Sequence, residues 1–473
     1  MALNEGSGTP RATPEDPRAY RATLDSLFAR RRFGIRPGLQ VVTAILAAHG
    51  DPQRRFPALH ITGSKGKGST AALAESVLRA HALKTGLFTS PHLSSFRDRI
   101  QVDRTPIPPP AVVAGVARID ATSRRLESEG AIDRPPTFFE VTTVLAFDWF
   151  AEQAVEAAVV EVGMGGRLDS TNVLASRVGV ITTIELEHTE LLGPDVGTIA
   201  REKSGIFHTG MTGVVGPLPP AAAAVAESEA DRAGVPLWHL GREVRYDHRA
   251  LSEAGQQVDL HFPGRTLEGV AVPLWGTFQA DNLACAVAAS ARFLSSLGRE
   301  LSPEATKRGL AKVRWPGRLE RVGRRPDLYY DVAHTPASAR ALAESLGELL
   351  PLADPDENAI VFGCLRGKDV ARILDALSPL ARTLVIVPVR SERSLSSTEI
   401  RVEAAGRFPR IVAARSAEEG VRMGRAATGP DGFTLVVGSD YLIGELLRPD
   451  GGIEPDLSDP GTEPPPARRR GVA

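Results

Sequence analysis

The chain has 473 residues, 42% of them hydrophobic and 24% charged, which is typical of a globular protein with two or more domains. Its 56 basic and 57 acidic residues nearly cancel, so no charge bias indicates nucleic acid or an anionic membrane as a partner. Two cysteines, no export signal and no apolar run of about 18 residues predict a cytoplasmic protein without a membrane span.

A glycine-rich turn between a predicted strand (57–61) and a predicted helix (about 69–82) is the most informative segment. Glycines let backbone N–H groups approach phosphate oxygens, and the helix N-terminus adds partial positive charge. We therefore predict a phosphate loop over residues 63–70, with Lys67 on the phosphates of a nucleotide and the Ser69 hydroxyl on Mg²⁺. The spacing differs from the common G-x-x-x-x-G-K-[ST] pattern, and an ordinary glycine-rich turn is the alternative. The loop comprises Gly63, Ser64, Lys65, Gly66, Lys67, Gly68, Ser69 and Thr70.

Continuous apolar strands then alternate with helical patterns, which predicts a mainly parallel sheet covered by helices on both faces. A loop with Ser90-Pro91-His92 follows the first of these strands. We expect strands at 85–89, 157–162 and 178–184, a polar helix within 106–130, helices at 138–152, 195–204, 278–297 and 302–313, and a hairpin at 257–273.

Glu161, His188 and Lys203 are candidate functional side chains in this alternating region. Glu161 ends an apolar strand and His188 comes soon after the next one, so both should face the crevice at the carboxyl ends of the strands. With Ser69 they could hold Mg²⁺, although imidazole is an unusual ligand for a hard ion. From spacing alone, His188 could equally be a structural histidine, and Lys203 a lysine on a helix surface.

A second alternating set begins after the break at 315–318, with strands expected at 328–332, 359–362, 383–387, 411–413 and 434–437. We predict two α/β domains, 19–317 and 318–448, joined near 315–325, and disordered segments at 1–18 and 449–473. Asn282, Arg318, Asp331, His334 and Ser439 stand at a helix start, in the break or after strands. Each has an ordinary alternative, such as helix capping, but together they predict a nucleotide site between the domains.

These motifs resemble the folylpolyglutamate synthase/dihydrofolate synthase family of the Mur ligase superfamily over roughly residues 20–447. The resemblance includes the phosphate loop and the segments at 33–39, 89–93, 139–140, 161–172, 202–206, 316–318, 331–336 and 368–369, together with Gln279 and Asn282. It implies a P-loop-containing central domain of the Mur ligase type and a smaller Rossmann-like C-terminal α/β domain.

The resemblance also implies an activity. ATP activates a pterin-linked carboxylate, dihydropteroate or a folate, as an acyl phosphate, and L-glutamate displaces the phosphate to form an amide. A monomer is expected. The implied magnesium residues are Ser69, Glu161, His188 and a carbamylated Lys203; the implied nucleotide contacts are Lys67, Asn282, Arg318 and Asp331; and the implied substrate residues are Ser90, Pro91, His92 and Asp169 for the pterin and His334 and Ser439 for glutamate.

Three residues depart from the family pattern. Lys65 replaces asparagine, Glu187 replaces aspartate, and Thr335 replaces asparagine after His334. A Mur-type ligase joining a different amino acid to a different carboxylate is therefore the first alternative, and a nucleotide-binding switch protein is the second. Glutamate-dependent phosphate release from ATP distinguishes either enzyme from the switch.

Overall fold

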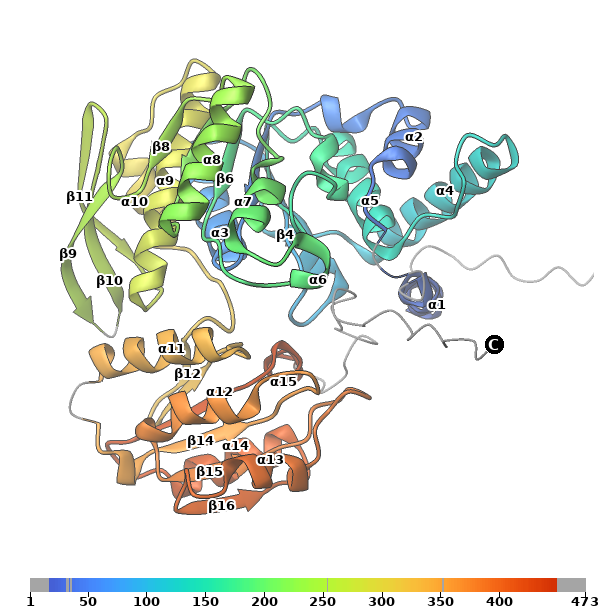
Figure 1. The fold of residues 1–473 in the computed structure, drawn as a ribbon. Coiled ribbons are helices and arrows are strands. Elements are labelled where there is room, and N and C mark those ends of the chain that lie inside the picture. Colours follow the sequence, from blue (N-terminus) through green and yellow to red (C-terminus); the bar gives the residue numbers. More distant parts are fainter. Residues whose placement is uncertain (1–16, 31–33, 35, 253, 351–352, 449–473) are drawn as a thin grey trace, which may run out of the picture.

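The computed structural model describes residues 17–30, 34, 36–252, 254–350 and 353–448. An eight-stranded sheet forms the centre of its first part, in the order β4-β3-β2-β5-β1-β6-β7-β8 (Figure 1). The six strands β2, β5, β1, β6, β7 and β8 pair in parallel, as predicted. Strands β3 and β4, which were not predicted, add an antiparallel edge beside β2. The strands are β1 (Ala58–Thr62), β2 (Thr85–Phe88), β3 (Ile100–Val102), β4 (Thr105–Pro106), β5 (Ala157–Glu161), β6 (Val178–Ile181), β7 (Thr212–Val215) and β8 (Leu237–His239).

Helices cover both faces of this sheet, because side chains alternate between two apolar cores. In β1, Leu59 and Ile61 join the core below α3 and α9, while Ala58 joins the opposite core with α1, α2, α4 and α5. A third core lies between β6, β7, α7 and α8. The helices are α1 (Pro17–Ala29), α2 (Gln40–Ala48), α3 (Lys67–Ala80), α4 (Pro109–Ser128), α5 (Phe138–Glu152), α6 (Thr189–Leu192), α7 (Val196–Ser204), α8 (Pro220–Ala233), α9 (Thr277–Ser296) and α10 (Pro303–Leu310).

A small antiparallel sheet flanks this part in the order β11-β10-β9. The predicted hairpin at 257–273 corresponds to β10 (Gly255–Phe262) and β11 (Arg265–Val272). Strand β9 (Arg245–Ser252) was not predicted, and its residues are almost all exposed.

The C-terminal part is built on a six-stranded sheet in the order β12-β13-β17-β14-β15-β16 (Figure 1). All its strands pair in parallel except β12, which was not predicted. One face packs against α11, α12 and α13, and the other against α14 and α15. The elements are β12 (Glu320–Gly323), β13 (Asp327–Tyr330), α11 (Pro336–Leu349), β14 (Ala359–Phe362), α12 (Val370–Leu377), β15 (Thr383–Ile386), α13 (Ser397–Ala404), β16 (Arg410–Ala413), α14 (Ala417–Ala427), β17 (Phe433–Val437) and α15 (Asp440–Leu446).

Two side chains from the first part enter the cores of the C-terminal part. Trp275 is 7% exposed and lies in the core with α11, its ring centroid 6.2 Å from that of Tyr329. Leu93, in the loop after β2, packs against the core with α15. The two sheets therefore share apolar contacts on both sides of the break at 315–318.

Helix α1 begins at Pro17, so residues 17 and 18 are helical although they were expected in the disordered segment. The rest of that segment, and the predicted tail at 449–473, lie outside the described residues. Among the described residues, no helix is both long and apolar enough to cross a bilayer. Cys285 and Cys364 are buried free thiols.

Candidate active site

A cavity of about 730 Å³ lies where the carboxyl ends of β1, β5 and β6 face the loop after β13. Its lining residues come from loops and helices of both parts of the chain. Many predicted residues line it, namely Ser64, Lys65, Gly66, Lys67, Gly68, Ser69, Ser90, Pro91, Glu161, Asp169, His188, Asn282, Arg318, Asp331 and His334. The lining does not include Gly63, Thr70, His92, Lys203 or Ser439.

The phosphate loop is held from two sides. Thr182 Oγ1 donates to the Lys65 carbonyl over 2.5 Å, and the Lys65 N–H donates to Thr183 Oγ1 over 2.9 Å. Gly66 has a φ of +82°, and a Cβ there would lie 2.1 Å from Asn282 Oδ1. A side chain at this position would therefore collide with α9, which explains why the loop needs glycine here.

The two lysines of the loop differ in their contacts. The Lys67 ammonium bends back over its own loop and donates to the carbonyls of Gly63 (2.9 Å) and Ser64 (3.5 Å). Burial lowers the pKa of Lys65, whose charge also faces the carboxylates of Glu185 and Glu187. Both lysines thus place positive charge on a loop whose backbone N–H groups could receive an anion.

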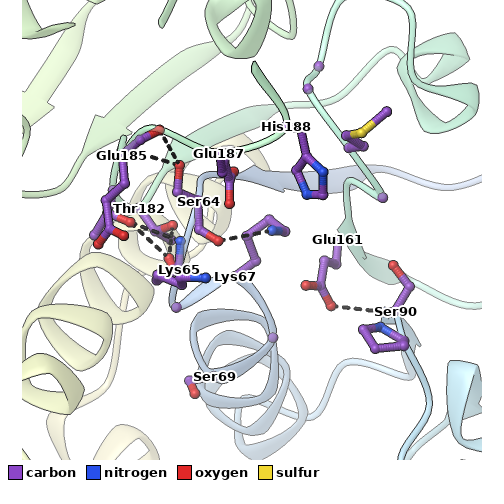
Figure 2. A pocket seen from close by; sticks show the side chains of 18 of the residues that line it. Ser64, Lys65, Lys67, Ser69, Ser90, Glu161, Thr182, Glu185, Glu187 and His188 are labelled. Atoms are coloured by element: carbon purple, nitrogen blue, oxygen red, sulfur yellow. Dashed lines mark hydrogen bonds between the residues drawn. The ribbon is translucent and has the colours of Figure 1, made fainter. Parts of the chain in front are cut away.

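Glu161 ends β5 and points into the cavity, where Figure 2 shows it with Lys67 and His188 around the same space. Its Oε2 accepts a hydrogen bond from the Ser90 N–H over 3.0 Å. Burial raises the pKa of Glu161 to about 6, against the opposing effect of the Lys67 charge. His188 lines the cavity from the start of α6, with a φ of +46° that few non-glycine residues adopt.

Lys203 lies on α7, 1% exposed, beneath the phosphate loop. Its ammonium donates to the Gly63 carbonyl over 3.0 Å and forms an ion pair of 2.9 Å with Glu187. Burial, followed by the charge of Lys67, lowers the pKa of Lys203 to about 8. The pKa of Glu187 falls to about 2, because the neighbouring lysine charges outweigh its own burial.

Asn282 and Gln279 connect α9 to the start of α3. Asn282 Oδ1 accepts from Thr70 Oγ1 over 3.4 Å, and its amide donates to Gln279 over 3.0 Å. The Gln279 amide in turn donates to Ser69 Oγ over 3.4 Å. Helix capping, the ordinary alternative for Asn282, does not apply, because α9 begins at Thr277 with Gly276 before it.

The C-terminal side supplies Arg318, Asp331 and His334. Asp331 is buried, and its carboxylate accepts from the N–H groups of Leu319 and Ala333, each over 2.7 Å. It therefore fixes the backbone beside both Arg318 and His334. The His334 Nδ1–H donates to the Val332 carbonyl over 2.9 Å, which leaves Nε2 as the acceptor of the neutral ring; burial lowers the pKa of His334.

Three predicted substrate residues are tied to their own surroundings. The Asp169 carboxylate accepts from the N–H groups of Met164 (2.9 Å) and Thr171 (3.0 Å), although it also borders the cavity. His92 is buried and accepts from Arg99 over 2.7 Å. Ser439 caps α15 by accepting from the Tyr441 N–H.

Several wall residues were not among the predicted site residues. Phe138 and Phe139 line the cavity from the start of α5, and Phe278 and Gln279 line it from α9. The helix α11 adds Ala337, Ser338 and Ala341. Gln279 had appeared only as part of the family resemblance, and its place three residues before Asn282 on the same helix is the sequence signal for its position in the wall.

Comparison with known proteins places this geometry in a family. The Mur ligase middle domain matches residues 61–290, and the Mur ligase glutamate ligase domain matches residues 317–440. The dihydrofolate synthase/folylpolyglutamate synthase of Mycobacterium tuberculosis is 37% identical over 388 residues, which are 79% of this chain and 79% of the relative.

Solved structures agree over most of the chain. The Mycobacterium tuberculosis folylpolyglutamate synthase complexed with ADP superposes with a TM-score of 0.81 at 32% identity, covering 90% of this chain and 97% of the other. The Escherichia coli protein FolC in complex with DHPP and ADP gives a TM-score of 0.79 at 28% identity, covering 93% and 98%. This chain therefore belongs to the dihydrofolate synthase/folylpolyglutamate synthase family of the Mur ligases.

Proposed function

We propose that this protein is an ATP-dependent ligase that joins L-glutamate to dihydropteroate, to folates, or to both, through an acyl phosphate. The observation that carries the proposal is the shared cavity, in which a phosphate loop and a buried carboxylate face an arginine and a histidine from the second sheet. The names of the relatives, and the DHPP and ADP bound to the Escherichia coli protein, support this reaction and these substrates.

The phosphate loop would bind the β- and γ-phosphates of ATP through its backbone N–H groups and Lys67. In the ligand-free geometry Lys67 donates to two carbonyls of its own loop. An incoming phosphate would replace these carbonyls as the acceptor, so the lysine needs to move little. Asn282 lines the cavity from α9 and Arg318 lines it from the linker before β12; both would complete the nucleotide site, with Asp331 holding the backbone next to Arg318.

The oxygen ligands of the cavity fit magnesium. Glu161 is a buried carboxylate, and burial raises its pKa by more than the nearby positive charges lower it. Ser69 adds a hydroxyl from the first turn of α3. No group of three or more histidine, cysteine or acidic side chains converges as a metal site within the described part of the chain. When bound, Mg²⁺ would neutralise charge on the transferring phosphoryl group; Ser69, Glu161 and His188 would hold it.

We propose that Lys203 contributes to this site as a carbamate. An ammonium cannot ligate a cation, and Lys203 Nζ is paired with Glu187 and Gly63. The nitrogen of the neutral amine adds to the carbon of carbon dioxide and loses one proton to solvent, which gives the carbamate anion; burial makes the neutral amine more accessible at Lys203 than at an ordinary lysine. The carbamate would release Glu187 and present an anion below the loop.

The acid substrate would lie at the end of the cavity bordered by Ser90, Pro91 and Asp169. Phe139 and Leu168 line the same cavity, and such apolar surfaces suit a flat heteroaromatic ring. The Ser90 N–H is hydrogen bonded to Glu161, so the wall of the acid site and the expected metal carboxylate are in direct contact. His92 and Ser439, both buried, would support the walls and not touch the substrates directly.

The chemistry then proceeds in two displacements. A carboxylate oxygen of the acid attacks the γ-phosphorus of ATP, the bond to ADP breaks, and an acyl phosphate forms. The amine of L-glutamate, after losing a proton, attacks the acyl carbon and inorganic phosphate leaves. His334 Nε2, which is unprotonated in the neutral ring and lies in the cavity wall, would accept that proton.

The deciding experiment measures phosphate release from ATP with dihydropteroate and tetrahydrofolate offered separately, each with and without L-glutamate. We expect glutamate-dependent release with at least one acid. Release that needs glutamate but neither acid, or no release with either acid, would contradict the proposed substrates and favour a Mur-type ligase with other substrates. We also propose a cytoplasmic monomer, which size-exclusion chromatography with light scattering would test.

A further inference from the structure

The linker between the two parts sends one large side chain onto the phosphate loop. Trp315 packs over the first turn of α3, where a Cβ on Gly68 would lie 2.9 Å from Trp315 Cζ2 and 3.4 Å from Glu161 Oε2. Gly68 has an ordinary helical backbone and lacks a positive φ. Its lack of a side chain is therefore explained by the indole ring, which occupies the space between the loop and the linker.

Arg104 contacts both the indole ring and the linker backbone beside it. Its guanidinium carbon lies 5.7 Å from the centre of the Trp315 ring, and its Nη2 donates to the Arg314 carbonyl over 2.7 Å. Arg104 is at the tip of the β3–β4 hairpin, where it has a φ of +67° and Asp103 one of +48°. Such backbone strain persists where the surroundings impose it, and here the Asp103 carboxylate accepts from the Thr85 N–H over 2.8 Å.

Packing, and not hydrogen bonding, keeps the ring in place. The Trp315 Nε1–H is buried and has no acceptor among the described residues. A buried donor without a partner is costly, so a tryptophan retained here must contribute through its shape. The ring is not among the residues that line the cavity, although Gly68, on which it packs, is one of them.

We propose that Trp315, held by Arg104, is a positioning residue that fixes Lys67 and Ser69 relative to the interdomain linker. Arg318 lies three residues further along the same linker and lines the cavity. The contact therefore gives the phosphate loop and the arginine of the opposite wall a common support. This inference rests on the proposed function only in taking ATP as the nucleotide.

The first test compares Trp315→Phe and Trp315→Ala with a matched control. Trp238 makes a similar contact with Arg292, at 4.5 Å, and lies outside the cavity lining, so Trp238→Ala is that control. Because a displacement of about 1 Å at a reacting group can cost about 100-fold in rate, we expect Trp315→Ala to lower kcat/KM for ATP by about 10- to 100-fold. Trp315→Phe should lie between wild type and alanine, with the KM for L-glutamate unchanged, and Trp238→Ala should stay close to wild type.

The second test uses compensation between two sites. Gly68→Ala should lose activity because its methyl group meets the indole. Since phenylalanine is shorter and ends before the position of Cζ2, Trp315→Phe should restore part of that activity in the double variant. Thermal melting checks that each variant is folded, and a merely structural role for Trp315 predicts additive losses in place of rescue.

Two outcomes would overturn the inference: equal kinetics for Trp315→Ala and Trp238→Ala, or a double variant no more active than Gly68→Ala. ADP binding by titration calorimetry is measured alongside, because it requires neither the acid nor glutamate. Trp315→Ala should weaken it while Trp238→Ala does not. ADP binding can be measured whichever acid the enzyme uses. A failure of the proposed substrates can therefore be distinguished from a failure of the role proposed for Trp315.

Discussion

His60 should make the stability of the central sheet depend on pH. It lies in β1, fully buried, and its Nε2 is 2.8 Å from Thr171 Oγ1. Because Thr171 Oγ1 donates its own hydrogen to Asp169, Nε2 must carry the proton, and Nδ1 is a buried acceptor without a partner in the described residues. A second proton on the ring would be a buried charge, and burial, with a smaller effect of His208, lowers the pKa of His60 to about 3.

The sign and size of the pH dependence of stability follow from the difference between the pKa values of His60 in the folded and unfolded chain. The unfolded chain, with an ordinary histidine pKa of 6.5, takes up a proton below that pH, whereas the folded chain excludes it until about pH 3. Stability is therefore fully present above pH 6.5 and is lost progressively as the pH falls toward 3. Between pH 7 and pH 4.5 the loss amounts to about 2.5 kcal/mol in the free energy of unfolding, because each pH unit of unequal protonation is worth about 1.4 kcal/mol.

Urea unfolding at pH 7 and pH 4.5 measures this loss. In His60→Gln the amide can still donate to Thr171 but cannot titrate, so the fall in stability between the two pH values should be smaller than in wild type by about 2.5 kcal/mol. His248→Gln, at an exposed position of β9, is the control and should behave as wild type. An equal fall in wild type and His60→Gln would refute the assignment of a neutral, buried imidazole.

Three further predictions concern catalysis. Lys67→Ala should lower turnover by orders of magnitude in a folded protein, because phosphoryl transfer depends on charge stabilisation; near-normal kcat would remove Lys67 from the site. Lys203→Ala should lose activity that a short-chain carboxylic acid partly restores, and intact-protein mass spectrometry should detect the carbamate in wild type; wild-type activity in the variant, with no added mass, would exclude carbamylation. His334→Ala should raise the KM for L-glutamate more than the KM for ATP, and a defect confined to ATP would move His334 to the nucleotide site.

The regular elements with apolar cores were predictable from the sequence. Strand β14 and helix α5 have the predicted bounds, because the first is a short apolar run and the second begins with a capping box between Thr137 and Glu140. Strand β9 was missed, since its exposed residues show no alternation of apolar and polar side chains and only pairing with β10 makes it a strand. The strands β3, β4 and β12 are short antiparallel edges with the same difficulty.

The sequence allowed prediction of the site residues that follow strands, but not of the residues that they contact. Glu161 and Asp331 were placed because side chains at the carboxyl ends of parallel strands share one edge. Their partners depend on the folded arrangement: Ser90 is 71 residues from Glu161, and Lys203 is 140 residues from the carbonyl of Gly63 that it contacts. The ion pair of Lys203 with Glu187 could not be predicted from spacing either, because a glutamate side chain, which is longer than the aspartate of the family pattern, can adopt many rotamers.

The entry of Trp275 and Leu93 into the cores of the C-terminal part has a consequence for dividing the protein. A fragment ending at residue 317, the predicted boundary, would expose the Trp275 ring that now lies against Tyr329, and it would also uncover Leu93. The complementary fragment would lose the Trp275 ring from its apolar core and the cover that Leu93 gives to the core with α15. Separately expressed halves should therefore aggregate and be poorly soluble alone, and mixing them should recover solubility if the predicted boundary divides one cooperative folding unit.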